Sequence, residues 1–240
     1  MKKLTLLILL VITSNSFRSL AFSSTPACRK TQDERKVSNF KGVAAGGPIN
    51  VKITLGNTES IRFEGDREAI AELISEVENG VLTIRPKTRW NEWSRRFTRP
   101  EITVFITAKR LTSLTMTGSG NMEVINAITG STLAVTLSGS GNIQGTTTVD
   151  SFAGEISGSG NITFSGKATD ATLTLSGSGS FRGKTLATEN AVVQISGSAD
   201  VSIRASAKLE AVISGSGDIH YSGNAVVKKT IIGSGSVSRL

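Results

Sequence analysis

The tripeptide Gly-Ser-Gly recurs through the second half of this chain at a nearly constant spacing. It begins at Gly118, Gly139, Gly158, Gly177, Gly215 and Gly233, and Gly197-Ser198-Ala199 is a variant between the fourth and fifth copies. Successive copies are therefore 18–21 residues apart. A fixed period of about 20 residues is typical of solenoids, in which each repeat forms one coil.

Alignment on the first glycine gives columns of similar residues. An apolar residue stands two positions before it and another four positions after it in every copy. The apolar positions alternate with polar ones, which is the period of a strand, and the glycines supply backbone angles that residues with a Cβ resist. Each repeat is therefore predicted to be strand, sharp corner and strand. The column three residues after the first glycine is polar and contains Asn121, Asn142, Asn161, Ser180, Asp200, Asp218 and Ser236.

Repeats with such constant columns favour a parallel β-helix, in which equivalent residues stack about 4.8 Å apart on neighbouring coils. The apolar columns then form one continuous core that a single coil could not bury. We expect an all-β solenoid of about seven coils over residues 111–240. The Asn/Ser column is expected to form a hydrogen-bonded ladder along the corners.

The region before the repeats has strand patterns of its own. Alternating segments at 49–55, 60–63, 81–84 and 102–106 indicate strands, and Asp66 is placed to cap a short helix over 67–78. We expect residues 37–110 to form a β-rich module with one helix. Such a module would cover the open end of the solenoid, which otherwise exposes an unpaired edge.

The chain begins with a segment typical of export signals. Met1-Lys2-Lys3 precedes the apolar run 4–12, which is too short to span a membrane, and cleavage is expected after Ala21. Residues 22–36 are expected to be a flexible leader. Cys28 is the only cysteine, so the chain can form no internal disulfide. It is either a free thiol or a lipid anchor, so the exported protein is predicted in the periplasm or at the cell surface, soluble or anchored.

Several of these features together resemble a known family. They are Gly65-Asp66 before the expected helix, the segment 79–84 (Asn-Gly-Val-Leu-Thr-Ile), the Ser-Gly-Ser-Gly-Asn/Asp coils, and the ending 214–223 followed by Gly233-Ser234-Gly235. Over residues 37–240 the chain is similar to the bacterial family called putative auto-transporter adhesin, head GIN domain. The resemblance implies a right-handed β-helix protein of the cell envelope, and it implies no catalytic residues.

The positive charge of the chain is concentrated in one segment. The full chain carries +8, and +5 remains once Lys2, Lys3 and Arg18 are removed with the signal. Residues 85–99 contain six basic residues and one acid, Glu92, which is also +5. The rest of the exported chain is therefore neutral, and the basic segment also holds both tryptophans.

Two interpretations of the basic segment stay open. It is either a long hairpin loop whose tryptophans pack on the N-terminal module and whose arginines are solvated, or a contact site for an anionic partner such as acidic glycan, lipopolysaccharide or a membrane surface. In a contact site, Arg would bind the anion and Trp would supply stacking area. Nucleic acid is not expected, because the protein is predicted to be exported. The candidate ligand-binding residues are Arg89, Trp90, Trp93, Arg95, Arg96, Phe97 and Arg99.

Enzymatic chemistry has one candidate pair. Asp200 and Asp218 share a column, so a β-helix places them about 5 Å apart, as in a cation site or a glycosidase pair. The alternative is that each Asp replaces Asn in the corner ladder. One His and one Cys cannot form a zinc site, no Lys-Ser/Thr follows the glycines as in phosphate-binding loops, and no calcium-binding nonapeptide repeat is present.

The sequence therefore predicts an exported binding or adhesion protein with no enzymatic activity, cofactor or metal. A polysaccharide-active enzyme using Asp200 and Asp218, or a purely structural envelope protein, are the alternatives. The ligand and the oligomeric state are not determined by the sequence.

Overall fold

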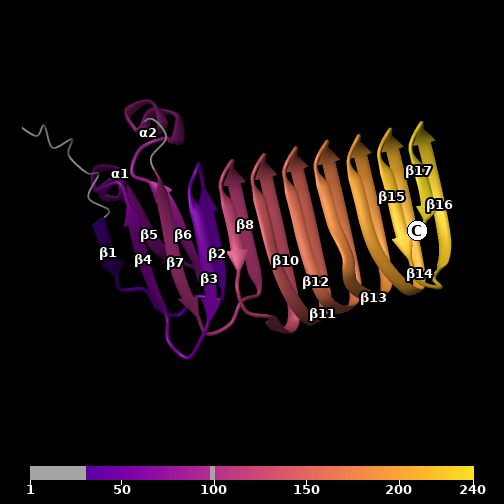
Figure 1. Cartoon of the computed structure of the whole chain (residues 1–240), viewed down its shortest axis with the longest axis horizontal. Helices are drawn as coiled ribbons and strands as arrows, with labels where there is room; N and C mark the ends of the chain where they lie inside the picture. Colours follow the sequence, from indigo (N-terminus) through magenta and orange to yellow (C-terminus); the bar gives the residue numbers. More distant parts are fainter. Residues whose placement is uncertain (1–30, 98–100) are drawn as a thin grey trace, which may run out of the picture.

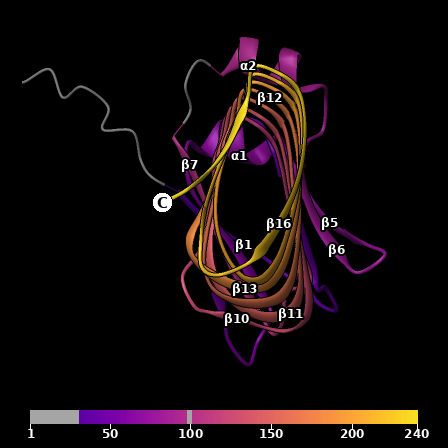
Figure 2. The same ribbon diagram turned by 90° about the vertical axis from the view of Figure 1, so that its right-hand side faces the viewer.

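The computed structural model describes residues 31–97 and 101–240. The chain forms an elongated solenoid whose coils stand side by side along one axis (Figure 1), and seen from the end the coils overlay as a flattened oval (Figure 2). The predicted signal at 1–21, Cys28 and Arg99 lie outside the described residues. Within those residues, neither helix has the length and hydropathy needed to cross a membrane.

The N-terminal part contains short strands and, within the described ranges, two short helices. Its elements are β1 (Thr31–Arg35), β2 (Gly42–Gly46), β3 (Asn50–Leu55), β4 (Ser60–Gly65), α1 (Arg67–Ala71), β5 (Leu73–Glu78), β6 (Val81–Pro86), α2 (Trp90–Arg96) and β7 (Ile102–Ala108).

The repeat region contains strands only. They are β8 (Ser113–Gly118), β9 (Asn121–Val124), β10 (Ile128–Gly139), β11 (Asn142–Gly158), β12 (Asn161–Gly177), β13 (Ser180–Gly197), β14 (Asp200–Gly215), β15 (Asp218–Ser222), β16 (Val226–Gly233) and β17 (Ser236–Arg239).

Neighbouring coils pair in parallel and in register. Ile156 of β11 lies beside Leu175 of β12, which lies beside Ile195 of β13. Strands such as β11 start directly after one Gly-Ser-Gly corner, bend at the opposite end of the oval, and finish at the next corner. The prediction of an all-β parallel solenoid of about seven coils is confirmed.

The first glycine of each motif has a backbone conformation that other residues rarely adopt. Its φ lies between +113° and +132° in all seven copies. Successive corners are joined by backbone hydrogen bonds, for example from Ser159 N to Gly139 O and from Ser178 N to Gly158 O, both 2.9 Å. A Cβ on Gly158 would lie 2.5 Å from that same Gly139 oxygen. The first glycine is therefore required both by its own φ and by the close approach of the preceding corner.

In the repeat region, the core is a stack of inward-facing aliphatic side chains that includes a cluster of phenylalanines. Phe152 packs against Phe164 and Phe181, with ring centroids 5.1 and 5.8 Å apart. Glycines make room for these rings, since a Cβ on Gly183 would lie 2.5 Å from the Phe181 ring. All three rings are fully buried, so the cluster fills the interior between the two faces of the oval.

The predicted ladder of polar side chains is present along the corners. Asn161 donates from Nδ2 to Oδ1 of Asn142 at 2.9 Å, and Asn142 donates to Asn121 at 2.8 Å. Asn121 in turn donates to Asn50 at 2.9 Å. The ladder is confirmed, and it continues into the N-terminal region.

That continuation exists because β2 and β3 are themselves a coil of the solenoid. β2 pairs in parallel with β6 on one side and β8 on the other, and β3 does the same with β7 and β9. Gly47 takes the place of the first corner glycine, with φ +73°. The expected boundary near residue 110 is therefore not a break in the sheets, since the solenoid begins inside the N-terminal region.

Two local predictions are wrong. The helix expected over 67–78 ends at Ala71, and Leu73–Glu78 is strand β5, paired antiparallel with β6. The Asn79-Gly80 turn explains the difference, because both residues have positive φ, as a two-residue hairpin turn requires. Asp66 does cap α1, accepting from the backbone N–H groups of Glu68 and Ala69. Of the flexible leader expected over 22–36, residues 22–30 lie outside the described residues, and Thr31–Arg35 form strand β1, paired antiparallel with β4.

Substitution of the first corner glycine should destabilise the fold more than substitution of the second. We expect Gly158→Ala to cost about 1–3 kcal/mol for the positive φ alone. A Cβ on Gly160 would also lie 2.5 Å from the Gly141 oxygen, but Gly160 has no positive φ. Because Ala199 and Ile49 already occupy the second position in other corners, Gly160→Ala should cost less. Urea denaturation midpoints measure the difference. Gly130→Ala is the control, since a Cβ there meets nothing within 4 Å. Equal losses for Gly158→Ala and Gly160→Ala would contradict the argument.

Interruption of the ladder should also lower stability. Asn142 both donates to Asn121 and accepts from Asn161, so Asn142→Ala removes two hydrogen bonds. A loss of about 1 kcal/mol in the free energy of unfolding is expected for these exposed contacts. Thermal and urea denaturation measure it. Ser140→Ala, an exposed corner substitution nearby, should change little, and an effect as large as that of Asn142→Ala would refute the role of the ladder.

Candidate functional site

The basic segment takes the place of one corner of the solenoid. Ala45 pairs with Ile84, and Asn50 pairs with Thr103 on the neighbouring coil. The short corner 46–49 is therefore replaced, between β6 and β7, by residues 85–102, which include α2. In Figure 1, α2 stands above the body of the solenoid, at the same edge as the Gly-Ser-Gly corners. The segment is thus an insertion at the corner edge.

A helical spacing of apolar residues explains why this insertion is folded. Trp90 and Trp93 lie three residues apart on one face of α2, and Phe97, the residue that caps the helix C-terminus, follows four residues later on the same side. The Trp93 side chain is 2% exposed and lies 5.4 Å, between ring centroids, from both Trp90 and Phe97. Residues 90–96 are therefore a helix and not the loop of the first interpretation, whereas the packing of the tryptophans that this interpretation included is present. Trp93 and Phe97 are core residues, so they offer no surface for a ligand to stack on.

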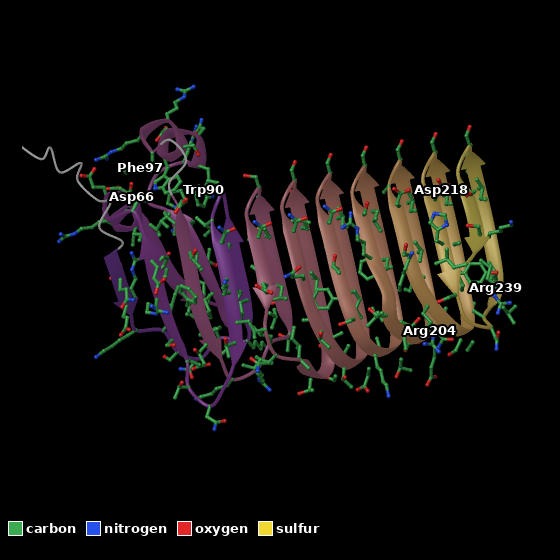
Figure 3. The ribbon with its side chains drawn as sticks, in the orientation of Figure 1. Asp66, Trp90, Phe97, Arg204, Asp218 and Arg239 are labelled. Atoms are coloured by element: carbon green, nitrogen blue, oxygen red, sulfur yellow. The ribbon has the colours of Figure 1, made fainter. Side chains whose placement is uncertain are left out.

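Glycines beneath α2 fix the position of Trp90. A Cβ on Gly46 would lie 2.7 Å from the Trp90 Nε1 atom, and a Cβ on Gly47 would lie 2.3 Å from its ring. Figure 3 shows Trp90 and Phe97 at the base of α2, next to the first coils. The half-buried indole therefore rests on the corner of the β2–β3 coil.

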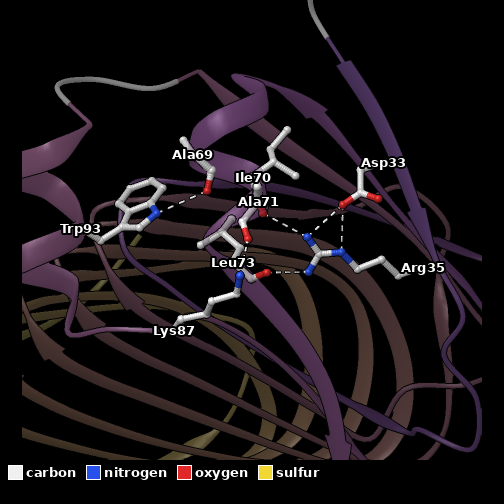
Figure 4. Close-up of polar contacts among 8 residues, drawn as sticks. All are labelled: Asp33, Arg35, Ala69, Ile70, Ala71, Leu73, Lys87 and Trp93. Carbon is white, nitrogen blue, oxygen red and sulfur yellow. Dashed lines mark hydrogen bonds and ion pairs between the residues drawn. The ribbon is translucent and has the colours of Figure 1, made fainter.

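Side chains from distant segments satisfy the carbonyl groups at the end of α1 (Figure 4). A helix end leaves such groups without partners in the helix, and here they accept from a tryptophan, an arginine and a lysine. Two of these donors belong to the basic segment, so part of it has a structural role. The contacts run from Trp93 Nε1 to Ala69 O (3.3 Å), Lys87 Nζ to Ala71 O (2.8 Å), Arg35 to Ile70 O (3.0 Å) and Leu73 O (2.7 Å), and Arg35 to the Asp33 carboxylate (2.9 Å).

The remaining basic residues divide into paired and unpaired ones. Arg85 forms an ion pair with Glu76 at 3.0 Å. Arg89, Arg95 and Arg96 are exposed, and no carboxylate of the described residues lies within ion-pair distance of them. The Arg96 guanidinium lies 5.3 Å from the centre of the Phe97 ring, which helps to hold it in place. We call Arg89, Arg95 and Arg96 the α2 arginines.

Two lysines on the last coils, unlike the α2 arginines, lie close to a carboxylate. Lys208 and Lys228 approach the Glu210 carboxylate to 3.3 and 3.7 Å. The hydrogen bond from Lys208 and the charges of both lysines lower the pKa of Glu210. Their charge is thus partly compensated within the protein, whereas that of the α2 arginines faces solvent.

Asp200 and Asp218 are neighbours in the corner ladder, as expected. They pair in register on β14 and β15. Asp218 accepts hydrogen bonds from the backbone N and the hydroxyl of Ser236, at 2.9 and 2.6 Å, so it takes the role that Asn has in the earlier coils. These contacts favour the ladder interpretation over a catalytic pair. Elsewhere in the described ranges, His, Cys, Asp and Glu do not gather in groups of three or more as a metal site would need.

Two features were missed in the sequence although signals were present. Gly47 and Asn50 have the spacing of a corner glycine and its ladder residue, which identifies a further coil. The spacing of Trp90, Trp93 and Phe97 is that of a helix, which identifies α2 and separates buried aromatic residues from exposed arginines.

Comparisons with solved structures agree with this architecture. A putative adhesin from Bacteroides fragilis NCTC 9343 is 21% identical with a TM-score of 0.79, covering 90% of this chain and 99% of its own. A putative lipid binding protein from Parabacteroides distasonis ATCC 8503 is 24% identical with a TM-score of 0.72, covering 88% and 96%. A putative adhesin from Parabacteroides merdae ATCC 43184 is 20% identical with a TM-score of 0.69, also covering 88% and 96%. At these identities the likeness concerns the fold alone.

Among curated proteins, no match is found. The model of one protein family matches residues 39–225, which includes the β2–β3 coil, α2 and most of the Gly-Ser-Gly repeats. The chain therefore belongs to the family described as putative auto-transporter adhesin, head GIN domain.

Proposed function

We propose that this protein is an exported, non-enzymatic adhesin-type protein of the cell envelope or cell surface that binds an anionic ligand through the α2 arginines. The observation that carries the proposal is the combination of a rigidly anchored helix with three exposed, unpaired guanidinium groups. The apolar face of α2 is held by Trp93 and by the Trp90 contact with Gly46. The arginines are therefore presented from a fixed base and not from a loose loop.

The chemistry of the site favours oxyanions. Guanidinium groups bind carboxylate and phosphate through paired donors, and no partner within the described chain competes for the α2 arginines. Because Trp93 and Phe97 are buried, recognition by aromatic stacking is not part of the proposal. Acidic glycan, lipopolysaccharide and anionic lipid headgroups all supply suitable groups at an envelope.

The comparisons support an adhesin-type role without identifying the ligand. The family description and two of the structural neighbours carry the word adhesin, and one neighbour is called a lipid binding protein. The hydrogen bonds of Asp218 within the ladder make the alternative of a polysaccharide-active enzyme less attractive. A purely structural protein is the other alternative, and it predicts that removal of these arginines leaves binding to anionic surfaces unchanged.

Removal of the α2 arginines should weaken binding to anionic surfaces. A basic side chain near such a surface contributes about 1 kcal/mol, so Arg89→Gln/Arg95→Gln/Arg96→Gln should lower affinity about 100-fold. The measurement is retention of the protein without residues 1–21 on acidic glycan beads and on vesicles of anionic lipid, each against a neutral counterpart. Retention of the unsubstituted protein should fall as salt rises from about 0.1 to about 1 M, because charges are then screened.

The matched control removes the same charge elsewhere. Lys208→Gln/Lys228→Gln/Lys229→Gln should leave retention nearly unchanged. Equal losses in both triple variants would mean that only net charge matters, and salt-insensitive retention by the unsubstituted protein would contradict the proposal. Retention on glycan beads alone or on vesicles alone identifies the ligand class.

A substitution that moves α2 without changing charge tests whether its position matters. Gly46→Leu should push the Trp90 indole off the β2–β3 corner, since even a Cβ there would lie 2.7 Å from Trp90 Nε1. We expect a red shift of tryptophan fluorescence and weaker retention, with the solenoid still folded by circular dichroism. Unchanged retention despite the fluorescence shift would show that the anchoring of α2 is irrelevant to binding.

A further inference from the structure

The pairings of strand β13 with β12 and with β14 contain register shifts, which the β10–β11 and β11–β12 pairings lack. β11 and β12 pair without a register shift from Asn142↔Asn161 to Val149↔Ala168. In β13 the register shifts against β12 beyond Arg182, and against β14 between Gly183 and Ala187. Lys184, Thr185 and Leu186 consequently have no Cα partner on β14. Lys184 and Thr185 are exposed and form a bulge on the outside of the solenoid, whereas Leu186 is buried in the core and pairs with Gly166 of β12.

The bulge borders a pocket with a definite chemical character. The cavity has a volume of about 430 Å³ and spans three successive coils. Its lining provides two cationic groups and three hydroxyl groups and contains no carboxylate. The lining residues are Thr163 of β12, Arg182, Lys184 and Thr185 of β13, and Ser202 of β14.

The cations of the pocket are not compensated by their neighbours. Arg182 pairs in register with Thr163 on one side and Ser202 on the other, and both are short hydroxyl side chains. In the described part of the chain, neither Arg182 nor Lys184 forms an ion pair.

We propose that this pocket is a binding site for a sugar that carries a sulfate or phosphate monoester. The tetrahedral oxyanion presents three terminal oxygens, which a forked guanidinium, an ammonium and hydroxyl donors can share. The cavity volume lies within the range of about 300–1,000 Å³ that small-molecule sites occupy, so there is room for a sugar ring beside the anion. Insertions in solenoid repeats and bulges in strands commonly mark binding surfaces. The site is independent of α2 and goes beyond the proposed function.

The test uses nuclear magnetic resonance on the protein without residues 1–21. Glucose 6-phosphate and glucose 6-sulfate are titrated separately, with glucose as the uncharged comparison. Saturable shifts should appear at the amide signals of residues 182–185 and Ser202 with an ester and not with glucose. Arg182→Gln/Lys184→Gln should weaken binding at least about tenfold, because two charge-assisted contacts are lost. The stronger of the two esters identifies the group that the pocket prefers.

Two control variants make the result specific. Lys208→Gln/Lys228→Gln removes the same charge from the last coils and should leave ester binding unchanged. The triple variant of the α2 arginines should also leave it unchanged, so failure of this proposal is distinguishable from failure of the proposed function. Shifts spread over all basic residues, equal weakening in the Lys208/Lys228 control, or equal shifts with glucose would each overturn the proposal.

Discussion

The backbone hydrogen bonds between successive Gly-Ser-Gly corners are the contacts on which the structure depends. Ser140 N donates to Gly118 O, Ser159 N to Gly139 O, and the series continues to Ser234 N and Gly215 O, with distances of 2.8–3.0 Å. Each corner can approach the previous one this closely only because its first residue has no Cβ and a positive φ. The parallel register, the stacked core and the Asn ladder all require that spacing. The near-identical geometry of successive coils is therefore set first by backbone contacts and only then by side chains.

The sequence predicts the repeated part of this fold well because every coil there has the same corner and the same alternation of buried and exposed residues. Apolar columns, corner glycines and the polar ladder are each visible in a single alignment of the chain with itself. The N-terminal region is harder because its strands do not follow one another in space. The β2–β3 coil lies between β6–β7 and β8–β9, so its partners are far away in sequence, and local patterns cannot reveal them.

The same contrast holds for the candidate site. The excess of positive charge in residues 85–99 is evident from composition. The structure shows which of these basic residues make contacts within the protein and which face solvent. Arg85 and Lys87 hold β5 and α1, whereas Arg89, Arg95 and Arg96 face solvent. Which basic residue meets a carboxylate or a carbonyl group depends on tertiary contacts that span tens of residues. The pocket beside β13 was not predicted. The register shift that accompanies it changes the spacing between two corner motifs only slightly, and such a change does not indicate a pocket.

The position of the β2–β3 coil has a consequence for how this architecture can change. The residues that position Trp90 and Trp93 of α2 lie in the N-terminal region, while the strands of each later coil pair with those of the coils next to it. Duplication or loss of a middle coil would therefore shift the far end by about 4.8 Å and leave the α2 surface as it is. The length of the solenoid and the surface of α2 are therefore separate variables in this molecule, so the number of coils can change without altering what the helix presents.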